Sequence, residues 1–352
     1  MKESFNFTNY FVDIKIWLIL KEEIEKFNNI LIVTGEKSFD AIKENFLPIM
    51  KNKKYTIKKY MGECSYEHSQ DIISSTSSEK FDLVIAAGGG KAVDTGKIIA
   101  SKLNLNLFAI PTIASTCAGT SSVCVVYNND HSFKELYFPK TAPEKVFIDL
   151  ETINNAPNKY LWAGIGDTLG KYYEVNLKKE NLSEKDSKIN FPSLMGIELA
   201  NNCKNIILEN SEKAYYDLGI TEEFKQVVLT IVVNTGMVSN LVDEFFNGGI
   251  AHSVFYGLTI LPNVEKNHLH GEVVAFGILV QLLIEKKYEE YSLLLDFYNK
   301  LKLPISLKEI VLFDNFLEKE DEILESILTS PDIVEFDFDI NKINLKEALL
   351  YK

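Results

Sequence analysis

The feature that most constrains the fold is a regular alternation of strand-like and helix-like segments over the first 150 residues. Short apolar runs rich in β-branched residues predict strands, and the segments between them have helical periodicity. Such alternation predicts a parallel sheet with helices on both faces. The expected strands span 29–34, 55–61, 81–87 and 106–110, and the expected helices span 37–51, 69–78 and 91–102. Segments 121–127 and 133–138 predict a hairpin with its turn at 128–131.

From about Leu150 the strand pattern fades and long helical periodicities replace it. A chain of 352 residues also exceeds the usual size of one hydrophobic core. We therefore expect an α/β domain over residues 1–150 and an all-helical domain over residues 151–352. The longest expected helices span 159–178, 191–208, 221–246 and 272–287.

The formal net charge of −13 disfavours nucleic acid or an anionic membrane as a partner, because the average surface field would repel either one. Small molecules are the expected partners. The four cysteines show neither CxxC spacing nor the dense framework of a small secreted domain, which predicts reduced thiols and a cytoplasmic location. We find no apolar stretch long enough for a transmembrane helix.

A glycine turn joins the third expected strand to the next helix and reads Gly88-Gly89-Gly90-Lys91-Ala92. Consecutive glycines let the backbone approach a ligand closely, and the N–H groups at a helix start attract phosphate oxygens. The turn therefore predicts a cradle for a pyrophosphate. It matches neither GxGxxG nor a Walker A loop, so a tight structural turn is the alternative.

A run of small and hydroxyl residues, 110–122, follows the carboxyl end of the next strand. Ligands in open α/β sheets bind at such ends. The alternative is a loop whose hydroxyl groups satisfy its own backbone.

Three segments of the helical half hold candidate ligands, Gly164–Asp167, Ala251–Ser253 and His268–Glu272, and the last two contain all three histidines of this half. Two imidazoles and one carboxylate supply three ligands and leave positions open for a substrate oxygen, which is the pattern of a catalytic metal site. A single histidine in a helix more often fills a core or capping position, but the three segments together favour a metal.

Several motifs occur in one order along nearly the whole chain: GGGKAVDTGK, PTIAST, AGIGDTLGKYYE, GMV, AHSVFYGLTILP and HGEVVAFG. Together they resemble the glycerol dehydrogenase branch of the iron-containing alcohol dehydrogenase-like superfamily, which shares its architecture with dehydroquinate synthase. The resemblance implies an N-terminal Rossmann-like domain, a C-terminal all-α domain and a cleft between them. It also implies NAD(P)(H), one divalent metal and a homo-oligomer.

The metal ligands implied by this resemblance are Asp167, His252 and His270, with Zn²⁺ favoured and Fe²⁺ as the alternative. Iron-type relatives commonly have a further histidine where this chain has Lys171, which favours a three-ligand site. His268 is a competitor for the role of His270. The implied cofactor contacts are Gly88, Gly89, Gly90, Lys91 and Ala92 at the pyrophosphate, and Thr112, Ser115, Ser121, Val123 and Tyr127 at the ribose and nicotinamide.

Two departures from the family pattern bear on specificity. Cys117 replaces an aspartate that helps to hold a polyol, and a subgroup with this change resembles hydroxycarboxylate dehydrogenases; the alternative for Cys117 is a small buried filler. After the first expected strand, Gly35 replaces an aspartate that accepts from the adenosine ribose. Lys37 is then available for a 2′-phosphate, which favours NADP(H) over NAD(H), although Glu36 weakens the argument.

The expected function is metal-dependent hydride transfer between NAD(P)(H) and a small hydroxy compound. The metal would polarise the substrate hydroxyl, and Lys171, one helical turn from Asp167, would hold the carboxylate of a 2-oxo or 2-hydroxy acid. An ion pair of Lys171 with Glu174 or another surface carboxylate is the alternative. The competing functions are a glycerol or polyol dehydrogenase, a lyase of the dehydroquinate synthase kind, and a catalytically silent binding protein.

Overall fold

The computed structural model describes residues 7–60, 62–128, 133–140, 142–182, 189–333 and 336–351. The chain forms two compact units, Met1–Asn158 and Lys159–Lys352. All the described strands belong to the first unit, and the regular elements described in the second unit are helices. None of the described helices is long and apolar enough to cross a membrane.

The first unit contains a six-stranded sheet with the strand order β1-β8-β5-β4-β2-β3, and every pair in it is parallel. The predicted parallel sheet is therefore confirmed. Strands β6 and β7 form the predicted antiparallel hairpin, whereas residues 129–131 of its expected turn lie outside the described residues. The elements are β1 (Asn9–Val12), α1 (Ile16–Glu23), β2 (Asn29–Thr34), α2 (Glu36–Met50), β3 (Lys54–Lys59), α3 (Tyr66–Ser75), β4 (Leu83–Gly88), α4 (Gly90–Leu103), β5 (Leu107–Pro111), β6 (Cys124–Tyr127), β7 (Phe133–Tyr137), β8 (Lys145–Ile148) and α5 (Leu150–Asn154).

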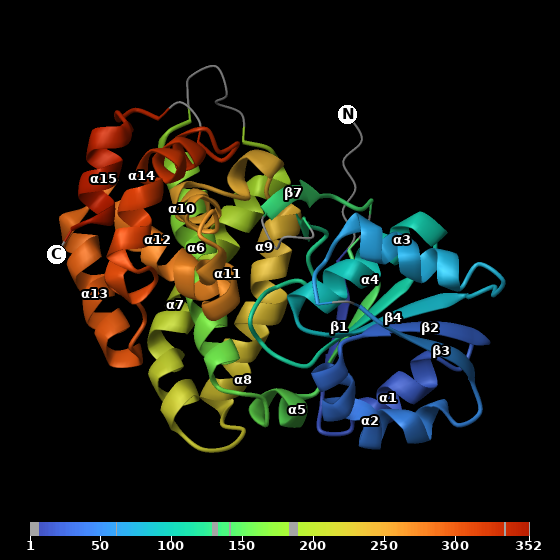
Figure 1. The fold of residues 1–352 in the computed structure, drawn as a ribbon. Coiled ribbons are helices and arrows are strands. Elements are labelled where there is room, and N and C mark those ends of the chain that lie inside the picture. Colours follow the sequence, from blue (N-terminus) through green and yellow to red (C-terminus); the bar gives the residue numbers. More distant parts are fainter. Residues whose placement is uncertain are drawn as a thin grey trace. The chain divides into compact units, whose positions relative to one another are not determined.

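Helices cover both faces of this sheet, because successive side chains of a strand point to opposite faces. Ile30 and Ile32 of β2 pack in the core that includes α1 and α2, whereas Leu31 and Val33 pack in the core that includes α3 and α4. Figure 1 shows α1 and α2 on one side of the sheet and α3 and α4 on the other. Burial on both faces explains why β2 reads as a continuous apolar run rather than an alternating one.

Three elements at one edge of the sheet were not predicted from the sequence: β1, β8 and α1. Strands β1 and β8 have four residues each, and β1 is half-exposed or exposed along its length. They pair with each other across more than a hundred residues of chain, from Asn9 with Lys145 to Val12 with Ile148. A short strand whose partner is so distant has no local pattern that predicts it.

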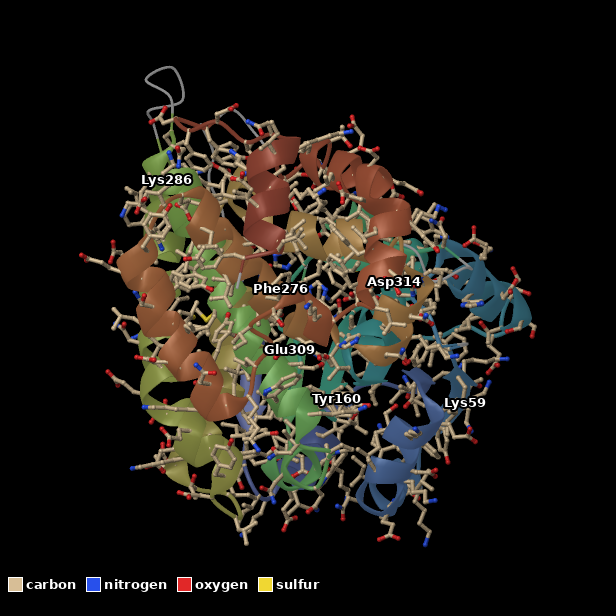
Figure 2. All side chains as sticks on the ribbon, turned by 60° about the vertical axis from the view of Figure 1, so that its left-hand side comes forward. Lys59, Tyr160, Phe276, Lys286, Glu309 and Asp314 are labelled. Carbon is tan, nitrogen blue, oxygen red and sulfur yellow. The ribbon has the colours of Figure 1, made fainter. Side chains whose placement is uncertain are left out.

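The second unit is helical throughout its described regular elements, as predicted. In Figure 2 the side chain of Phe276, which is 2% exposed, lies among these helices, whereas the exposed Lys286 lies at the periphery. The elements are α6 (Lys159–Glu180), α7 (Phe191–Tyr216), α8 (Glu222–Leu229), η1 (Thr230–Asn234), α9 (Thr235–Leu241), η2 (Glu244–Phe246), α10 (Ile250–Leu258), α11 (Pro262–Asn267), α12 (His270–Ile284), α13 (Tyr288–Leu301), η3 (Leu307–Glu309), α14 (Phe313–Leu328) and α15 (Lys342–Leu349).

The expectation of one helix over 221–246 was wrong. The segment consists of α8, a π-helical turn η1 and α9, and the backbone leaves the helix at Val242. The physical reason lies in the next residue, because the N–H of Asp243 donates to Ser193 Oγ at 3.0 Å and its carboxylate accepts from Asn190 at 2.7 Å. These bonds to the start of α7 replace the bonds that a continued helix would make.

Glycines allow α6, α10 and α12 to pack with their backbones in contact. A Cβ on Gly271 of α12 would lie 1.9 Å from the carbonyl oxygen of Ala163 on α6, and one on Gly166 would lie 2.3 Å from the carbonyl oxygen of Gly271. A Cβ on Gly277 would lie 2.5 Å from the carbonyl oxygen of Ala251 on α10. A residue with a side chain would fit at these positions only if the helices moved apart.

We expect Gly271→Ala to destabilise the protein by about 3 kcal/mol, because the added methyl group meets backbone that cannot rotate away. Gly170→Ala is the matched comparison, since its Cβ would meet a side-chain methyl group of Val274 at 2.6 Å. We expect a smaller loss there. Urea unfolding followed by circular dichroism measures both, and equal losses would contradict the importance of the backbone contact.

Candidate functional site

Three of the close-packed helices each contribute one polar side chain to a cluster: Asp167 from α6, His252 from α10 and His270 from α12. The Nε2 atoms of the two histidines lie 3.3 Å apart. Asp167 Oδ1 lies 3.3 Å from His270 Nε2 and 3.9 Å from His252 Nε2. Two nitrogen atoms and one oxygen atom, from three separate segments of the sequence, therefore face one another.

These distances fit the ligand set of a single ion. When a metal binds tetrahedrally with bonds of about 2.0–2.1 Å, its ligand atoms lie about 3.3 Å apart. Two of the three separations match this spacing, and the third, from Asp167 Oδ1 to His252 Nε2, is wider at 3.9 Å. Two nitrogens and one oxygen in this arrangement suit three corners of a tetrahedron whose fourth corner is left for a substrate oxygen. Among the described residues, this is the group of histidine, cysteine, aspartate and glutamate side chains with the spacing of a metal site.

The charges of the cluster also suit a cation. Burial alone would raise the pKa of Asp167, but the hydrogen bond and charge of His270 keep that pKa below its usual value. Burial would lower the pKa of His252, but the negative charge of Glu174 raises it above its usual value, so a cation that binds this ring must displace a proton from it. The aspartate is therefore ionised and able to bind a cation.

Glu174 is a part of this cluster that the sequence analysis named only as a possible partner of Lys171. It lies on α6, is 0% exposed, and its Oε2 lies 2.6 Å from His252 Nδ1. Its other oxygen accepts the backbone N–H of His252 at 2.8 Å. The spacing of seven residues after Asp167 puts both carboxylates on one face of a helix, which is the signal that would have identified it.

The structure separates two neighbouring residues from the ligand cluster. His268, the competitor of His270, pairs instead with Glu272, whose Oε1 lies 2.9 Å from His268 Nδ1. Lys171 is buried rather than on the surface, and its ammonium donates to the backbone carbonyl of Asn247 at 2.9 Å and to its amide oxygen at 3.2 Å. Its positive charge helps to keep the pKa of Asp167 low.

In the first unit, the glycine turn lies where the sequence predicts it, between β4 and α4. Gly88 has a φ of +154°, and a Cβ on it would lie 2.7 Å from Ala92 Cβ. A Cβ on Gly89, the residue that precedes the first turn of α4, would lie 2.6 Å from Ile113 Cδ1. Backbone conformation and packing therefore favour glycine at position 88 whether or not a phosphate approaches it, whereas at position 89 the end of the Ile113 side chain could move aside.

The other predicted cofactor residues surround this turn, but several are already engaged. Lys91 forms an ion pair with Glu63 at 2.7 Å and lies 4.8 Å from the ring centre of Tyr127. Thr112 is buried and donates its N–H to the carbonyl of Gly88 at 3.1 Å. Ser115, Cys117 and Val123 are half-buried, Ser121 is buried, and Lys37 is exposed on the first turn of α2.

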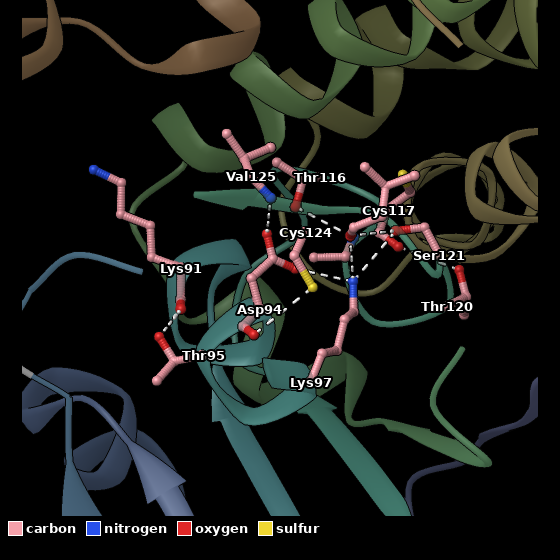
Figure 3. A network of polar contacts seen from close by, with 12 residues as sticks. Lys91, Asp94, Thr95, Lys97, Thr116, Cys117, Thr120, Ser121, Cys124 and Val125 are labelled. Atoms are coloured by element: carbon pink, nitrogen blue, oxygen red, sulfur yellow. Dashed lines mark hydrogen bonds and ion pairs between the residues drawn. The ribbon is translucent and has the colours of Figure 1, made fainter. Parts of the chain in front are cut away.

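A buried ion pair anchors the hydroxyl-rich loop to α4, and the sequence analysis missed it (Figure 3). Lys97, which is 2% exposed, donates to Asp94 at 2.9 Å and to the backbone carbonyl of Val123 at 2.8 Å. Asp94 in turn accepts the backbone N–H of Val125 at 3.1 Å. The i, i+3 spacing of Asp94 and Lys97 could have predicted the ion pair from the sequence. No sequence pattern predicts the backbone groups to which the two side chains bond.

The surroundings of Lys37 also bear on the choice of dinucleotide. Its neighbour Glu36 forms an exposed ion pair with Lys59 at 3.1 Å. In that ion pair, the positive charge of Lys59 offsets part of the negative charge of Glu36, which would repel a 2′-phosphate. Gly35 precedes the first turn of α2 and carries no charge.

Known proteins resemble the chain over most of its length. The family model described as iron-containing alcohol dehydrogenase matches residues 8–150. Hydroxycarboxylate dehydrogenase A of Escherichia coli is 35% identical over 272 residues, which cover 76% of this chain and 74% of that protein. Glycerol dehydrogenase of Thermotoga maritima is 31% identical over 300 residues, which cover 83% of this chain and 80% of that protein.

Solved structures confirm the predicted fold. A probable glycerol dehydrogenase from Sinorhizobium meliloti superposes with a TM-score of 0.86 at 23% identity, covering 99% of this chain and 97% of that one. Sequence identity above 30% over three quarters of the chain, together with this fold, confirms the resemblance seen in the motifs. The chain therefore belongs to the iron-containing alcohol dehydrogenase family and is an oxidoreductase of the alcohol dehydrogenase type.

Proposed function

We propose that this metal-dependent, NAD-linked oxidoreductase of a small hydroxy compound acts on 2-oxo and 2-hydroxy acids. The observation that carries the catalytic part is the convergence of Asp167, His252 and His270 on one point. The substrate class rests on Cys117, which lies where polyol-binding relatives have an acceptor, and on the buried cation of Lys171. The relative named hydroxycarboxylate dehydrogenase A supports this class.

The proposed metal residues are Asp167, His252 and His270. A bound divalent ion supplies a Lewis acid that polarises the oxygen on the reacting carbon of the substrate. The three side chains would hold it and leave a position open toward that oxygen. Spacings close to those of a tetrahedral site favour Zn²⁺ over Fe²⁺.

The dinucleotide is assigned to the first unit, at the turn Gly88–Gly90. The N-terminus of α4 lies at this turn, and the N–H groups at a helix start suit phosphate oxygens. The loop that follows β5, which Lys97 anchors, would line the ribose and nicotinamide. Gly35 and Lys37 favour NADP(H) over NAD(H).

The chemistry of the proposed substrate follows from charge. Cys117 carries no negative charge where polyol-binding relatives have a carboxylate, so an anionic substrate meets less repulsion. Lys171 would hold the substrate carboxylate if its ammonium exchanged one of its bonds to Asn247.

A polyol is the second candidate, and one observation favours it. The ammonium of Lys171 already donates to two oxygens of Asn247, so binding a carboxylate requires it to give up an existing bond. The relative named glycerol dehydrogenase is consistent with this alternative.

The metal assignment predicts that alanine at Asp167, His252 or His270 weakens Zn²⁺ binding by about tenfold or more, because each variant removes one of three ligands. His268→Ala is the matched control, since His268 lies near the cluster but bonds to Glu272. Metal content after dialysis and titration calorimetry measure the effect. Loss of binding in His268→Ala equal to that in His270→Ala would contradict the assignment.

The cofactor assignment predicts that Gly89→Val weakens dinucleotide binding by more than about tenfold, because added bulk at the turn blocks a phosphate. Contact with Ile113 could produce the same loss through packing alone, so the test pairs it with Gly89→Val/Ile113→Ala, which makes room for the new side chain. Binding should stay weak in the double variant, with Ile113→Ala alone as the control. Recovery of NADH and NADPH affinity in the double variant would mean that the turn has only a structural role.

The substrate assignment predicts that Lys171→Met lowers kcat/KM for 2-oxo acids at least about tenfold more than for neutral aldehydes, since it removes the cation that pairs with the carboxylate. Cys117→Asp should shift activity in the opposite direction, toward glycerol. A panel of both substrate classes measures these ratios. If Lys171→Met slows both classes equally, or if the unmodified enzyme prefers glycerol, the polyol alternative is correct.

A further inference from the structure

Glu174 binds His252 at two points at once. Its Oε2 lies 2.6 Å from the ring Nδ1, and its Oε1 accepts the backbone N–H at 2.8 Å. The carboxylate is 0% exposed, so water does not compete for either bond. One buried side chain thus restrains both the backbone and the ring of a proposed metal ligand.

This contact exists because α6 reaches the start of α10. The residue before the first turn of α10 is Gly249, which has no side chain to cap the helix, and Glu174 supplies the missing acceptor from α6. A Cβ on Gly249 would lie 2.9 Å from Glu174 Cγ. Because Gly249 has no side chain, the carboxylate of Glu174 can occupy the position that a side-chain N-cap would take.

The bond to the ring has a consequence for the opposite nitrogen. An ionised carboxylate only accepts hydrogen bonds, so Nδ1 must carry the proton and neutral His252 keeps a lone pair on Nε2. That lone pair faces Asp167 and His270 at 3.9 Å and 3.3 Å. We propose that Glu174 is the positioning residue of His252 and selects the tautomer that can bind a metal; this inference rests on the proposed metal site.

The second histidine lacks such a partner. Nδ1 of His270 is buried, and no described residue hydrogen-bonds to it. Its ring instead packs edge-on against Phe255, with centroids 4.3 Å apart. Packing orients His270 but does not select its tautomer, so Glu174 acts on one ligand of the pair.

The decisive variant is Glu174→Gln, which keeps the shape of the side chain. The carboxylate accepts from two N–H groups of His252, whereas the amide has only one oxygen to accept and an NH₂ group that donates. If the NH₂ group faces the ring, the proton moves to Nε2 and blocks the metal; if it faces the backbone, the cap is lost. We expect Zn²⁺ affinity to fall between about tenfold and a hundredfold. In a His252→Ala background the same change should have no further effect, because the histidine it acts through is absent.

Glu272→Gln is the matched control. Glu272 makes a similar pair of bonds outside the cluster: its Oε1 lies 2.9 Å from the ring Nδ1 of His268, and its Oε2 accepts the backbone N–H of the next residue, Leu269, at 3.0 Å. We expect its Zn²⁺ affinity to equal that of the unmodified protein. Thermal unfolding of all metal-free variants checks the fold, and equal losses of affinity in Glu174→Gln and Glu272→Gln would overturn the inference.

The outcomes separate this inference from the metal assignment. If His252→Ala binds Zn²⁺ as well as the unmodified protein, the metal assignment fails and the inference fails with it. If His252→Ala loses affinity but Glu174→Gln does not, the metal assignment stands and Glu174 is not a positioning residue.

The proton position on His252 can also be measured in the unmodified protein, so this test does not depend on whether a variant folds. Nitrogen chemical shifts of ¹⁵N-histidine in the metal-free protein at alkaline pH report which ring nitrogen carries the proton. For His252 we expect the proton on Nδ1. A proton on Nε2 would overturn the inference.

Discussion

The arrangement of the helical unit depends on the packing of α6 against α12, in which the two helix backbones are in direct contact. Gly166 and Gly271 face each other so closely that a Cβ on either would overlap a carbonyl oxygen. Each of these glycines is next to a proposed metal ligand, Asp167 and His270. The same absence of side chains that lets the helices approach therefore sets the distance between the two ligands, and small shifts of either helix would change it.

Each unit contains a buried ionic contact between side chains. In the second unit Glu174 binds His252, and in the first unit Lys97 binds Asp94 and a loop carbonyl. A buried charge without a partner is costly, so removing one member of a pair costs more than the pair contributes by itself. These pairs are better understood as restraints on geometry: one orients a proposed ligand, and the other fixes the loop that contains Cys117.

Family membership and substrate choice depend on different residues. The chain is similar over most of its length both to a relative named for glycerol and to one named for hydroxycarboxylates. Discrimination between such substrates needs only one or two charges in the right place, because a carboxylate and a hydroxyl differ mainly in charge. Cys117 and Lys171 are the positions that we propose make this choice.

Periodicity in the sequence by itself determined the parallel sheet, its central strands and most long helices, because burial of strands and helix faces leaves a local pattern. Motif order determined the family and pointed to Asp167, His252 and His270. The tertiary structure alone decided the pairing of β1 with β8, the end of α9 at Leu241, and the engagement of Lys171 by Asn247. It also decided that Glu174, not a residue near His252 in sequence, orients that histidine. Each of these depends on a contact between residues far apart in the chain, and neither residue alone carries a pattern that names its partner.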